Sequence, residues 1–592
     1  MTHATPGKPT MAKPTISAPQ RALVEKHAAT LDAAMDAVMS RKSWSPFKDS
    51  PSSKIHGEEK PPAGKAAFEA RLNQRFDIDL PGITGWSGEE VSPFTREPLG
   101  ITYPLCEPEA LIASAKTAMA DWSKASPGLR IALCLEVAEQ LYDNNFEMAH
   151  AVMHVAGQSY TQAFSGSGPN ALDRGIEALA YAAMAMDKVT PAAEYHRQFG
   201  RDQVALEKTY TLVPRGVGLV ICCASFPTWN AYPAMFASLA TGNPVIVKPH
   251  PIAILPMAIV VERCRAVLSA FGFDPNLVTL AADTIAEPIA GHYVDHPDVQ
   301  IIDFTGSPRY GSHLEKTVTG KQLFTETAGV NSVVVESVDD LVASMRAIAR
   351  ASSLFSAQMC TSPQVVFVPK DGIQTRDGHA SFDAVAQCIV DEIDALAANP
   401  KVAAGIMGAV QAQLSLDVVT EASQMAGGEG LRILREGEAY AHPDFPKALT
   451  RTMMVIAGDS SHQAMYAEER FGPVLFVVAT DSADAAAQEA TELARTRGTI
   501  SCYMYSTDED FIDRWVDVYA AVGANLSINL TGAMWINFAA AYSDYHVTGL
   551  NPAGNACLAD LSFVASRFRI AQRRRPIVTP LSGSAEKTAS TG

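Results

Sequence analysis

Two residues of this chain have side chains suited to covalent chemistry, and 34 positions separate them. Cys360 lies in the segment Ser-Ala-Gln-Met-Cys-Thr, and a cysteine thiolate is strongly nucleophilic near neutral pH. Glu326 lies in Phe-Thr-Glu-Thr-Ala-Gly, after an apolar stretch and before small residues. Its carboxylate is therefore predicted to be partly buried and able to act as a base. Taken singly, each residue has a structural alternative, because most lone cysteines are packing residues and most glutamates are surface residues.

The elements that must position these residues begin at residue 216. Short apolar runs that predict buried strands alternate with segments that predict helices, and this alternation is typical of a parallel, doubly wound sheet. The expected strands are 216–223, 244–248, 277–281 and 299–304, and the expected helices are 229–241, 254–271, 285–293 and 311–318. A second alternating block at about 326–500 has strands near 331–335, 364–368, 452–456 and 474–478. The fold class is therefore α/β.

Ligands of a doubly wound sheet bind at the carboxyl ends of its strands, and three of the expected strand ends carry polar residues. The first strand end carries an amide side chain beside an aromatic ring. The second carries a lysine, which can donate a hydrogen bond to a phosphate or to a ribose hydroxyl. The third leads through a glycine into the start of a helix, where free backbone N–H groups can bind an anion. These residues are Trp229 and Asn230, then Lys248, then Gly306, Ser307 and Gly311. The fingerprint GxGxxG is absent, and each signal alone is weak.

A further polar segment, Glu-Glu-Arg-Phe-Gly-Pro-Val at 468–474, is predicted to end a helix and start a strand. Glu469 could accept hydrogen bonds from sugar hydroxyls, and Phe471 could cover a ring face.

Composition narrows the class of protein. The net charge of −17 argues against binding to nucleic acid or to anionic membranes. Nine cysteines without a CxxC pair argue against a disulfide framework or a structural metal site, and favour the reducing cytoplasm. The first twenty residues lack the apolar core of a secretory signal. Residues 216–247 carry no charge, but prolines, glycines and asparagines interrupt them, so we interpret them as strand, helix and strand rather than a membrane span.

The flanking regions have simpler patterns. Residues 1–20 and 578–592 are expected to be flexible tails, 21–41 a helix and 43–66 a loop. Apolar stripes at 111–122 and 131–141 predict two helices, and alternation near 195–215 predicts an exposed hairpin.

In combination and in order, these segments resemble the aldehyde dehydrogenase superfamily over roughly residues 100–575. The matching motifs are Thr228-Trp-Asn230, Gly242-Asn-Pro-Val-Ile-Val-Lys248-Pro249, Phe304-Thr-Gly-Ser307 with Gly311, Glu326-Thr-Ala-Gly329, Ala357-Gln-Met-Cys360 and Glu468 to Pro473. The resemblance implies that Cys360 is the nucleophile, Glu326 the base for hydrolysis and Asn230 an oxyanion donor. It also implies a nicotinamide cofactor, NADP or NAD, held by Trp229, Lys248, Gly306, Ser307, Gly311, Glu469 and Phe471.

Two departures from the family pattern bear on the cofactor and the substrate. Pro251 stands three residues after Lys248, where members that use NAD commonly carry a ribose-binding Glu. The sequence therefore does not favour NAD over NADP as the cofactor. The family's Pro-Phe-Gly-Gly segment is replaced by 549–554, which changes a wall of the substrate funnel.

The resemblance also predicts a domain division. The predicted division begins with an amino-terminal extension at 1–99. A doubly wound cofactor domain follows at 100–325 and includes a small oligomerisation hairpin at about 195–212. An α/β catalytic domain follows at 326–500, and 501–577 return to the cofactor domain and supply oligomerisation strands. In this superfamily the hairpin and the carboxy-terminal strands exchange between subunits, so we expect a homodimer or homotetramer.

The resemblance implies a small-molecule aldehyde as the substrate, and a narrower resemblance suggests which one. The long amino-terminal extension and the segments 228–233, 326–331 and 357–364 resemble the phenylacetic acid degradation group, PaaN, which is associated with oxidation of a ring-opened, CoA-linked semialdehyde. The arginines at 567, 569 and 573–575 could grip CoA phosphates or form a solvated basic face. Two other functions stay open: a CoA-acylating dehydrogenase or acyl-CoA reductase, and a non-catalytic nucleotide-binding scaffold.

Overall fold

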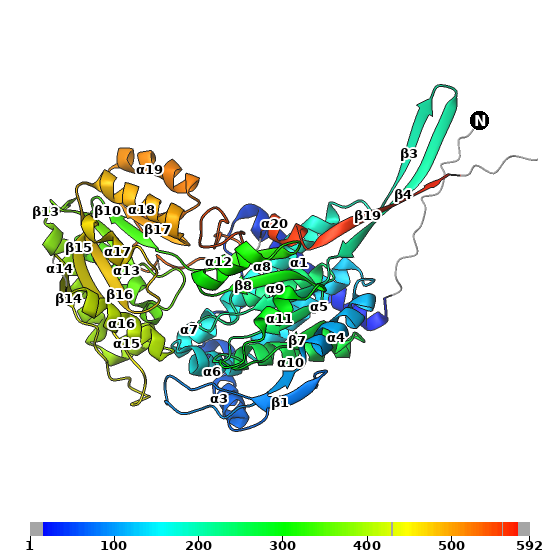
Figure 1. Cartoon of the computed structure of the whole chain (residues 1–592), viewed down its shortest axis with the longest axis horizontal. Coiled ribbons are helices and arrows are strands. Elements are labelled where there is room, and N and C mark those ends of the chain that lie inside the picture. Colours follow the sequence, from blue (N-terminus) through cyan, green and yellow to red (C-terminus); the bar gives the residue numbers. More distant parts are fainter. Residues whose placement is uncertain (1–15, 428–429, 535, 559, 578–592) are drawn as a thin grey trace, which may run out of the picture.

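A five-stranded parallel sheet, with strand order β7-β6-β5-β8-β9, occupies the middle of the molecule (Figure 1). The computed structural model describes residues 16–427, 430–534, 536–558 and 560–577. Order reverses between β5 and β8, which is the switch point where doubly wound sheets bind ligands. The strands are β5 (Val217–Ile221), β6 (Val245–Lys248), β7 (Val278–Leu280), β8 (Val299–Thr305) and β9 (Gln322–Glu326).

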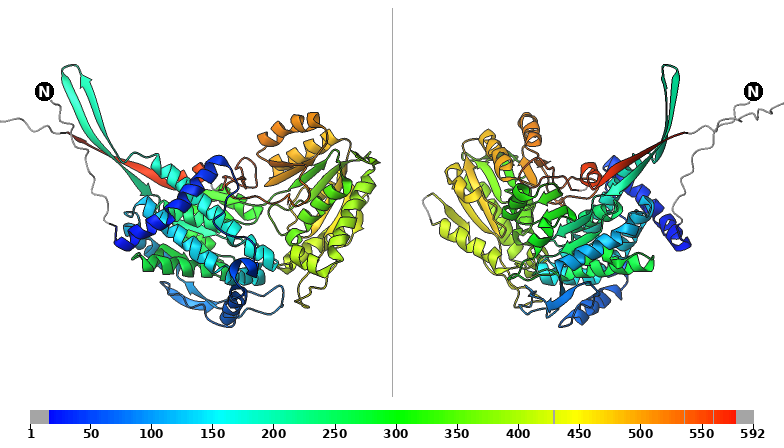
Figure 2. Two further views of the ribbon diagram at one scale, coloured as in Figure 1. Left: turned by 180° about the vertical axis from the view of Figure 1, so that it is seen from behind. Right: turned by 45° about the vertical axis from the view of Figure 1, so that its right-hand side comes forward.

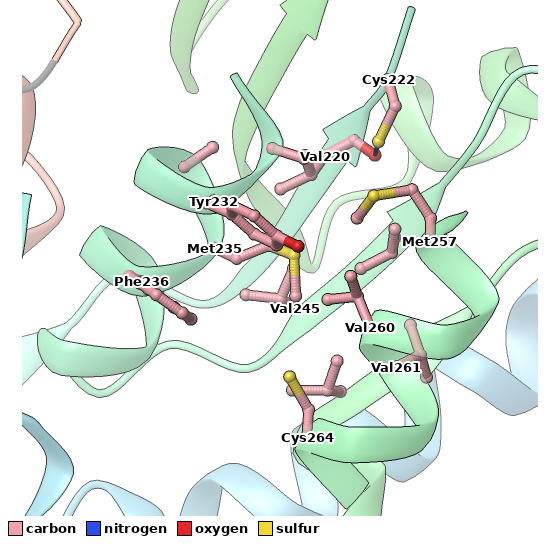
Figure 3. Close-up of a cluster of buried hydrophobic side chains, with 14 of the residues drawn as sticks. Val220, Cys222, Tyr232, Met235, Phe236, Val245, Met257, Val260, Val261 and Cys264 are labelled. Carbon is pink, nitrogen blue, oxygen red and sulfur yellow. Dashed lines mark hydrogen bonds between the residues drawn. The ribbon is translucent and has the colours of Figure 1, made fainter. Parts of the chain in front are cut away.

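Helices cover this sheet on both sides, as buried parallel strands require. Figure 3 shows apolar side chains of α9 (Ala231–Ala240) and α10 (Leu255–Ala270) meeting those of β5 and β6. Residues 216–247 are thus β5, α9 and β6, as predicted, and no described helix is long and apolar enough to cross a bilayer. One predicted helix was wrong at its start: α11 spans Ala290–Asp295, because the Asp283 carboxylate accepts the backbone N–H of Ile289 and holds the preceding residues in a loop.

A second, seven-stranded sheet has the order β14-β15-β16-β11-β10-β17-β18, and only the β14–β15 pair is antiparallel. Val333 and Val335 pack with α13 (Leu341–Ser353) and α14 (Phe382–Ala397), whereas Val334 packs on the other face with α18 (Ala483–Arg497) and α19 (Glu509–Ala521). The strands are β10 (Ser332–Val335), β11 (Val365–Pro369), β14 (Arg432–Arg435), β15 (Met454–Asp459), β16 (Val474–Thr480), β17 (Ser501–Tyr505) and β18 (Asn525–Ile528).

The membership of β17 and β18 corrects one predicted boundary. Residues 501–528 were expected to return to the first domain, but they complete the seven-stranded sheet. The apolar run of β17 pairs in parallel with β10, and such long-range pairing leaves no local signature in the sequence.

The predicted hairpin is present as β3 (Ala192–Phe199) and β4 (Asp202–Pro214), and β19 (Phe568–Pro576) pairs with β4. This arm projects from the body in all views (Figures 1 and 2). The arginine run does not form one surface, because Arg567 is fully buried in an ion pair with Asp303, whereas the later arginines lie on β19.

The amino-terminal region packs against the first domain. The predicted helix is α1 (Ala18–Ser40), which lies on α5 (Pro127–Asp143) and α8 (Pro169–Asp187). The loop expected at 43–66 was wrong in part, since it contains α2 (Ser53–His56) and the start of α3 (Lys60–Arg71), whose first turn accommodates proline. Of the expected tails, 1–15 and 578–592 lie outside the described residues.

The remaining elements connect these layers. They are β1 (Ile83–Ser87), β2 (Tyr103–Cys106), α4 (Pro108–Trp122), α6 (Asn145–Ala156), α7 (Tyr160–Ser165), η1 (Pro275–Leu277), α12 (Pro308–Thr317), η2 (Leu354–Ala357), β12 (Ile373–Thr375), β13 (Gly378–Ala380), α15 (Pro400–Met407), α16 (Gln413–Met425), η3 (Ser460–His462), α17 (Gln463–Tyr466) and α20 (Leu561–Ala565).

Candidate active site

A cavity of 1440 Å³ opens at the switch point of the five-stranded sheet and extends to the seven-stranded sheet. Nine of the ten residues singled out in the sequence line it: Trp229, Asn230, Lys248, Gly306, Ser307, Glu326, Cys360, Glu469 and Phe471. Gly311 does not line the cavity. It lies in α12, where a side-chain carbon would come within 2.6 Å of the Thr327 methyl group, so its role is to let the helix approach the segment after Glu326.

The backbone before Cys360 is strained. Phe355, Ser356 and Ala357 have φ angles of 51°, 48° and 55°, a region that costs side-chain-bearing residues of the order of 1 kcal/mol each. The Ser356 hydroxyl donates to two backbone carbonyls at 3.2 Å, and the Gln358 amide donates to two more, so the turn is held from outside. Ala357 stands where the family motif has glycine, which suits a positive φ.

Asn331 fixes the Cys360 loop to the seven-stranded sheet. Its Nδ2 donates to the backbone oxygens of Cys360 at 2.8 Å and Ser362 at 3.0 Å. Its Oδ1 accepts from the backbone N–H groups of Ile500 at 3.0 Å and Ser501 at 3.2 Å, at the start of β17. The sequence contained Asn331 only as the end of a motif, with nothing to assign this positioning role.

Glu326 and Cys360 both contact His546, a residue that no sequence pattern marked. Its Nε2 lies 3.1 Å from Glu326 Oε1 and 3.7 Å from Cys360 Sγ. Both Glu326 and His546 are buried, whereas Cys360 is half-buried and faces the cavity. His546 precedes the divergent 549–554 segment and belongs to no motif, so only the folded chain brings it here.

The divergent segment, 549–554, contacts the backbone of Glu326 and Thr327. Gly554 makes an antiparallel bridge with Glu326, and the Thr327 N–H donates to the Ala553 oxygen at 2.7 Å. The segment therefore fixes the backbone around Glu326, but none of residues 549–554 lines the cavity.

Asn230 ends the β5 connection immediately before α9. Its side chain does not cap the helix: Nδ2 donates to Thr305 Oγ1 at 3.1 Å, and the buried Oδ1 has no hydrogen-bond partner among the described residues. The second Nδ2 hydrogen is therefore free for a ligand in the cavity.

Lys248 does not point into the cavity as an isolated cation. Its Nζ donates to Asp283 Oδ1 at 2.7 Å and to the Pro249 oxygen at 3.0 Å. Asp283 also lines the cavity, and both side chains are buried. Asp283 follows β7 by three residues, a strand end that the sequence did not mark because no motif surrounds it.

Two further residues complete this end of the cavity. Ser307 caps α12 by accepting the Tyr310 N–H at 3.4 Å, and burial raises the pKa of Glu469 to about 7. Among the described residues that line the cavity, Lys248 is the only lysine or arginine.

Comparisons with known proteins agree on one family. A model of the aldehyde dehydrogenase family matches residues 87–535. A solved NAD-dependent aldehyde dehydrogenase from Burkholderia multivorans is 43% identical, with a TM-score of 0.91 over 94% of this chain and 99% of that one. A 1-pyrroline-5-carboxylate dehydrogenase from Bacillus pumilus is 25% identical over 72% of this chain and 79% of its own length. An NADP complex of glyceraldehyde-3-phosphate dehydrogenase from Bacillus halodurans shares the fold, with 19% identity and a TM-score of 0.64 over 85% of this chain and all of that one.

Proposed function

This chain belongs to the aldehyde dehydrogenase family and is an NAD(P)-dependent enzyme, and we propose that it oxidises an aldehyde to a carboxylic acid through a thioester on Cys360 that water hydrolyses. The observation that carries the proposal is the contact of Cys360 and Glu326 with the same imidazole at 3.7 and 3.1 Å. A nucleophile and a base held this close can act on one carbonyl carbon in succession.

Side chains and backbone groups of this chain would carry out every step except the acceptance of hydride. The Cys360 thiolate adds to the aldehyde carbon, and the free Nδ2 hydrogen of Asn230 and the backbone N–H of Cys360 hold the oxyanion. One such donor contributes roughly 3 kcal/mol to the transition state. Glu326 then takes a proton from the water that attacks the thioester, and the Cys360 thiolate leaves. A bound nicotinamide dinucleotide supplies the hydride acceptor.

The residues present fit such a cofactor. The cavity lies at the carboxyl ends of β5, β6 and β8 and reaches the first turn of α12. Lys248, Asp283 and Glu469 would hold the ribose hydroxyls, Ser307 and Trp229 would contact the pyrophosphate, and Phe471 would contact the nicotinamide, since all six residues line the cavity.

The buried pair of Lys248 and Asp283 supports NAD as the preferred cofactor. Pro251 leaves no carboxylate at the expected position, but Asp283 supplies one from the neighbouring strand, 2.7 Å from Lys248. A 2′-phosphate would meet this carboxylate, and its charge would find no arginine among the described lining residues.

Three apolar residues of the cavity lining support an aldehyde with an apolar body. Leu414, Met534 and Phe538 are exposed and line the cavity. A semialdehyde of phenylacetate breakdown is our narrower proposal, and it rests on the three sequence segments that resemble the PaaN group. A CoA moiety would have to bind beyond the described lining, because its phosphates find no free cation there and Arg567 is buried.

A steady-state screen tests these proposals. Apolar aldehydes, CoA-linked and free semialdehydes, and 1-pyrroline-5-carboxylate, the compound named in the curated relatives, would be compared with NAD and with NADP. We expect turnover of apolar aldehydes with NAD and release of a free acid. Turnover that requires added CoA and yields a thioester would instead establish the acylating alternative, and absence of turnover with every aldehyde would favour the scaffold.

A further inference from the structure

The environment of Cys360 opposes the ionisation that its proposed role requires. Desolvation, together with the nearby Glu326, Cys223 and Glu469, raises the pKa of the Cys360 thiol well above its ordinary value. A thiol in such a place needs either a neighbouring cation or a neighbouring base before it can attack a carbonyl carbon.

His546 is the side chain placed to supply both. Its Nε2 lies 3.7 Å from Cys360 Sγ, and its Nδ1 is buried without a hydrogen-bond partner among the described residues. The titratable groups that face this cluster are Glu326 from β9, Cys223 after β5 and Glu469 before β16, and the Trp229 ring lies 5.8 Å from the imidazole. Lys248, the one lysine or arginine in the described lining, is engaged by Asp283.

We propose that His546 is a catalytic residue that takes the thiol proton of Cys360 and keeps it as an imidazolium between the thiolate and Glu326. The S–H bond breaks, its electron pair remains on sulfur, and the proton forms an N–H bond at Nε2. The product is a cation between two anions, which low-polarity surroundings favour over a lone thiolate. The function of this step rests on the proposed aldehyde oxidation, but the proton transfer itself needs neither aldehyde nor cofactor.

Two arginines fix the backbone of the segment that precedes His546. Arg174 of α8 donates to the backbone oxygen of Asp544 at 2.8 Å, and Arg41 at the end of α1 donates to that of Tyr542 at 3.0 Å. The amino-terminal region therefore positions the segment that carries His546, which gives the extension a role at the site.

The test is the rate at which iodoacetamide alkylates Cys360, followed by peptide mass spectrometry from about pH 5 to about pH 10. The proteins are the wild type, His546→Gln and the matched control Tyr545→Phe, whose side chain is 45% exposed on the same segment. We expect His546→Gln to lower the rate near neutral pH by about tenfold or more and to move the profile to higher pH, with Tyr545→Phe overlaying the wild type. Coincident profiles for His546→Gln and the wild type would overturn the proposal.

A second measurement decides the question even if His546→Gln does not fold. The ultraviolet absorbance of the thiolate, wild type minus Cys360→Ser, is recorded against pH without ligands. A thiolate signal that persists below the ordinary thiol range supports the pair, and a signal that appears only in strongly alkaline solution refutes it. Because neither measurement uses an aldehyde, a failure here is distinguishable from a failure of the proposed oxidation.

Discussion

Lys248 and Asp283 form a buried ion pair at 2.7 Å that joins the ends of two neighbouring strands, β6 and β7. The pair places a carboxylate in the part of the cavity where we propose that the cofactor binds, although Pro251 occupies the position at which relatives that use NAD commonly carry one.

The first prediction concerns cofactor choice. Asp283→Asn removes the negative charge that would repel a 2′-phosphate, so the ratio of kcat/KM for NAD to that for NADP should fall by about tenfold. Steady-state kinetics with both cofactors measures the ratio, and Glu287→Gln, an exposed change on the same loop, is the control. An unchanged ratio in Asp283→Asn would show that this carboxylate does not select NAD.

The second prediction concerns pH. Burial raises the pKa of Glu469 to about 7, so this carboxyl is neutral below that pH and ionised above it. Only the ionised form is a full acceptor for ribose hydroxyls, so the KM for the cofactor should rise as the pH falls below about 7. Glu469→Gln should abolish this dependence, whereas the exposed Glu468→Gln should retain it. A pH dependence of cofactor KM that survives in Glu469→Gln would contradict the assignment.

The third prediction separates a positioning role from a surface contact. Arg41→Ala removes donors to Tyr542 and Tyr181 and leaves the buried Glu177 with one cation fewer, so stability should fall by about 1–3 kcal/mol. Because the His546 segment loosens, kcat should also fall in protein that remains folded. Lys26→Ala, which breaks exposed ion pairs on the same helix, should change both by little. Equal effects of the two changes on kcat would refute the positioning role.

The fourth prediction concerns the projecting arm. The arm formed by β3, β4 and β19 projects from the body (Figure 1) and exposes the apolar side chains of Phe199, Val213 and Ile570 along its length. We expect a homodimer or homotetramer, and replacing residues 195–206 by a short turn should give a single-chain mass in light scattering. A wild-type protein that is already monomeric at assay concentration would show that the arm has another role.

Much of this fold follows from the sequence, and the reason is local. The strands of the first sheet are continuous apolar runs because both faces are covered, and the residues at their ends are adjacent to those runs. The amino-acid pattern alone therefore places Asn230, Lys248 and Ser307 at one edge of the sheet, whereas Glu326 joins that edge only through β9 (Gln322–Glu326), a strand that was not predicted for this sheet.

The remaining parts depend on contacts between distant segments. His546 is 220 residues from the carboxylate that it contacts, and no periodicity surrounds it. Asp283 follows a three-residue strand without a motif, and β17 and β18 join a sheet whose other strands lie earlier in the chain. Such long-range pairings are decided by packing, which single-sequence patterns do not record.

The fifth prediction tests the central claim, the thioester on Cys360. Glu326→Gln keeps the shape of the base but cannot accept a proton, so hydrolysis should slow by about a hundredfold or more while hydride transfer continues. The variant is mixed with aldehyde and NAD, quenched rapidly, and its peptides are weighed, with the wild type and Glu468→Gln as controls. We expect NADH equal in amount to the enzyme and an acyl group on the Cys360 peptide. Full turnover without an acyl group on Cys360 would contradict the thioester mechanism.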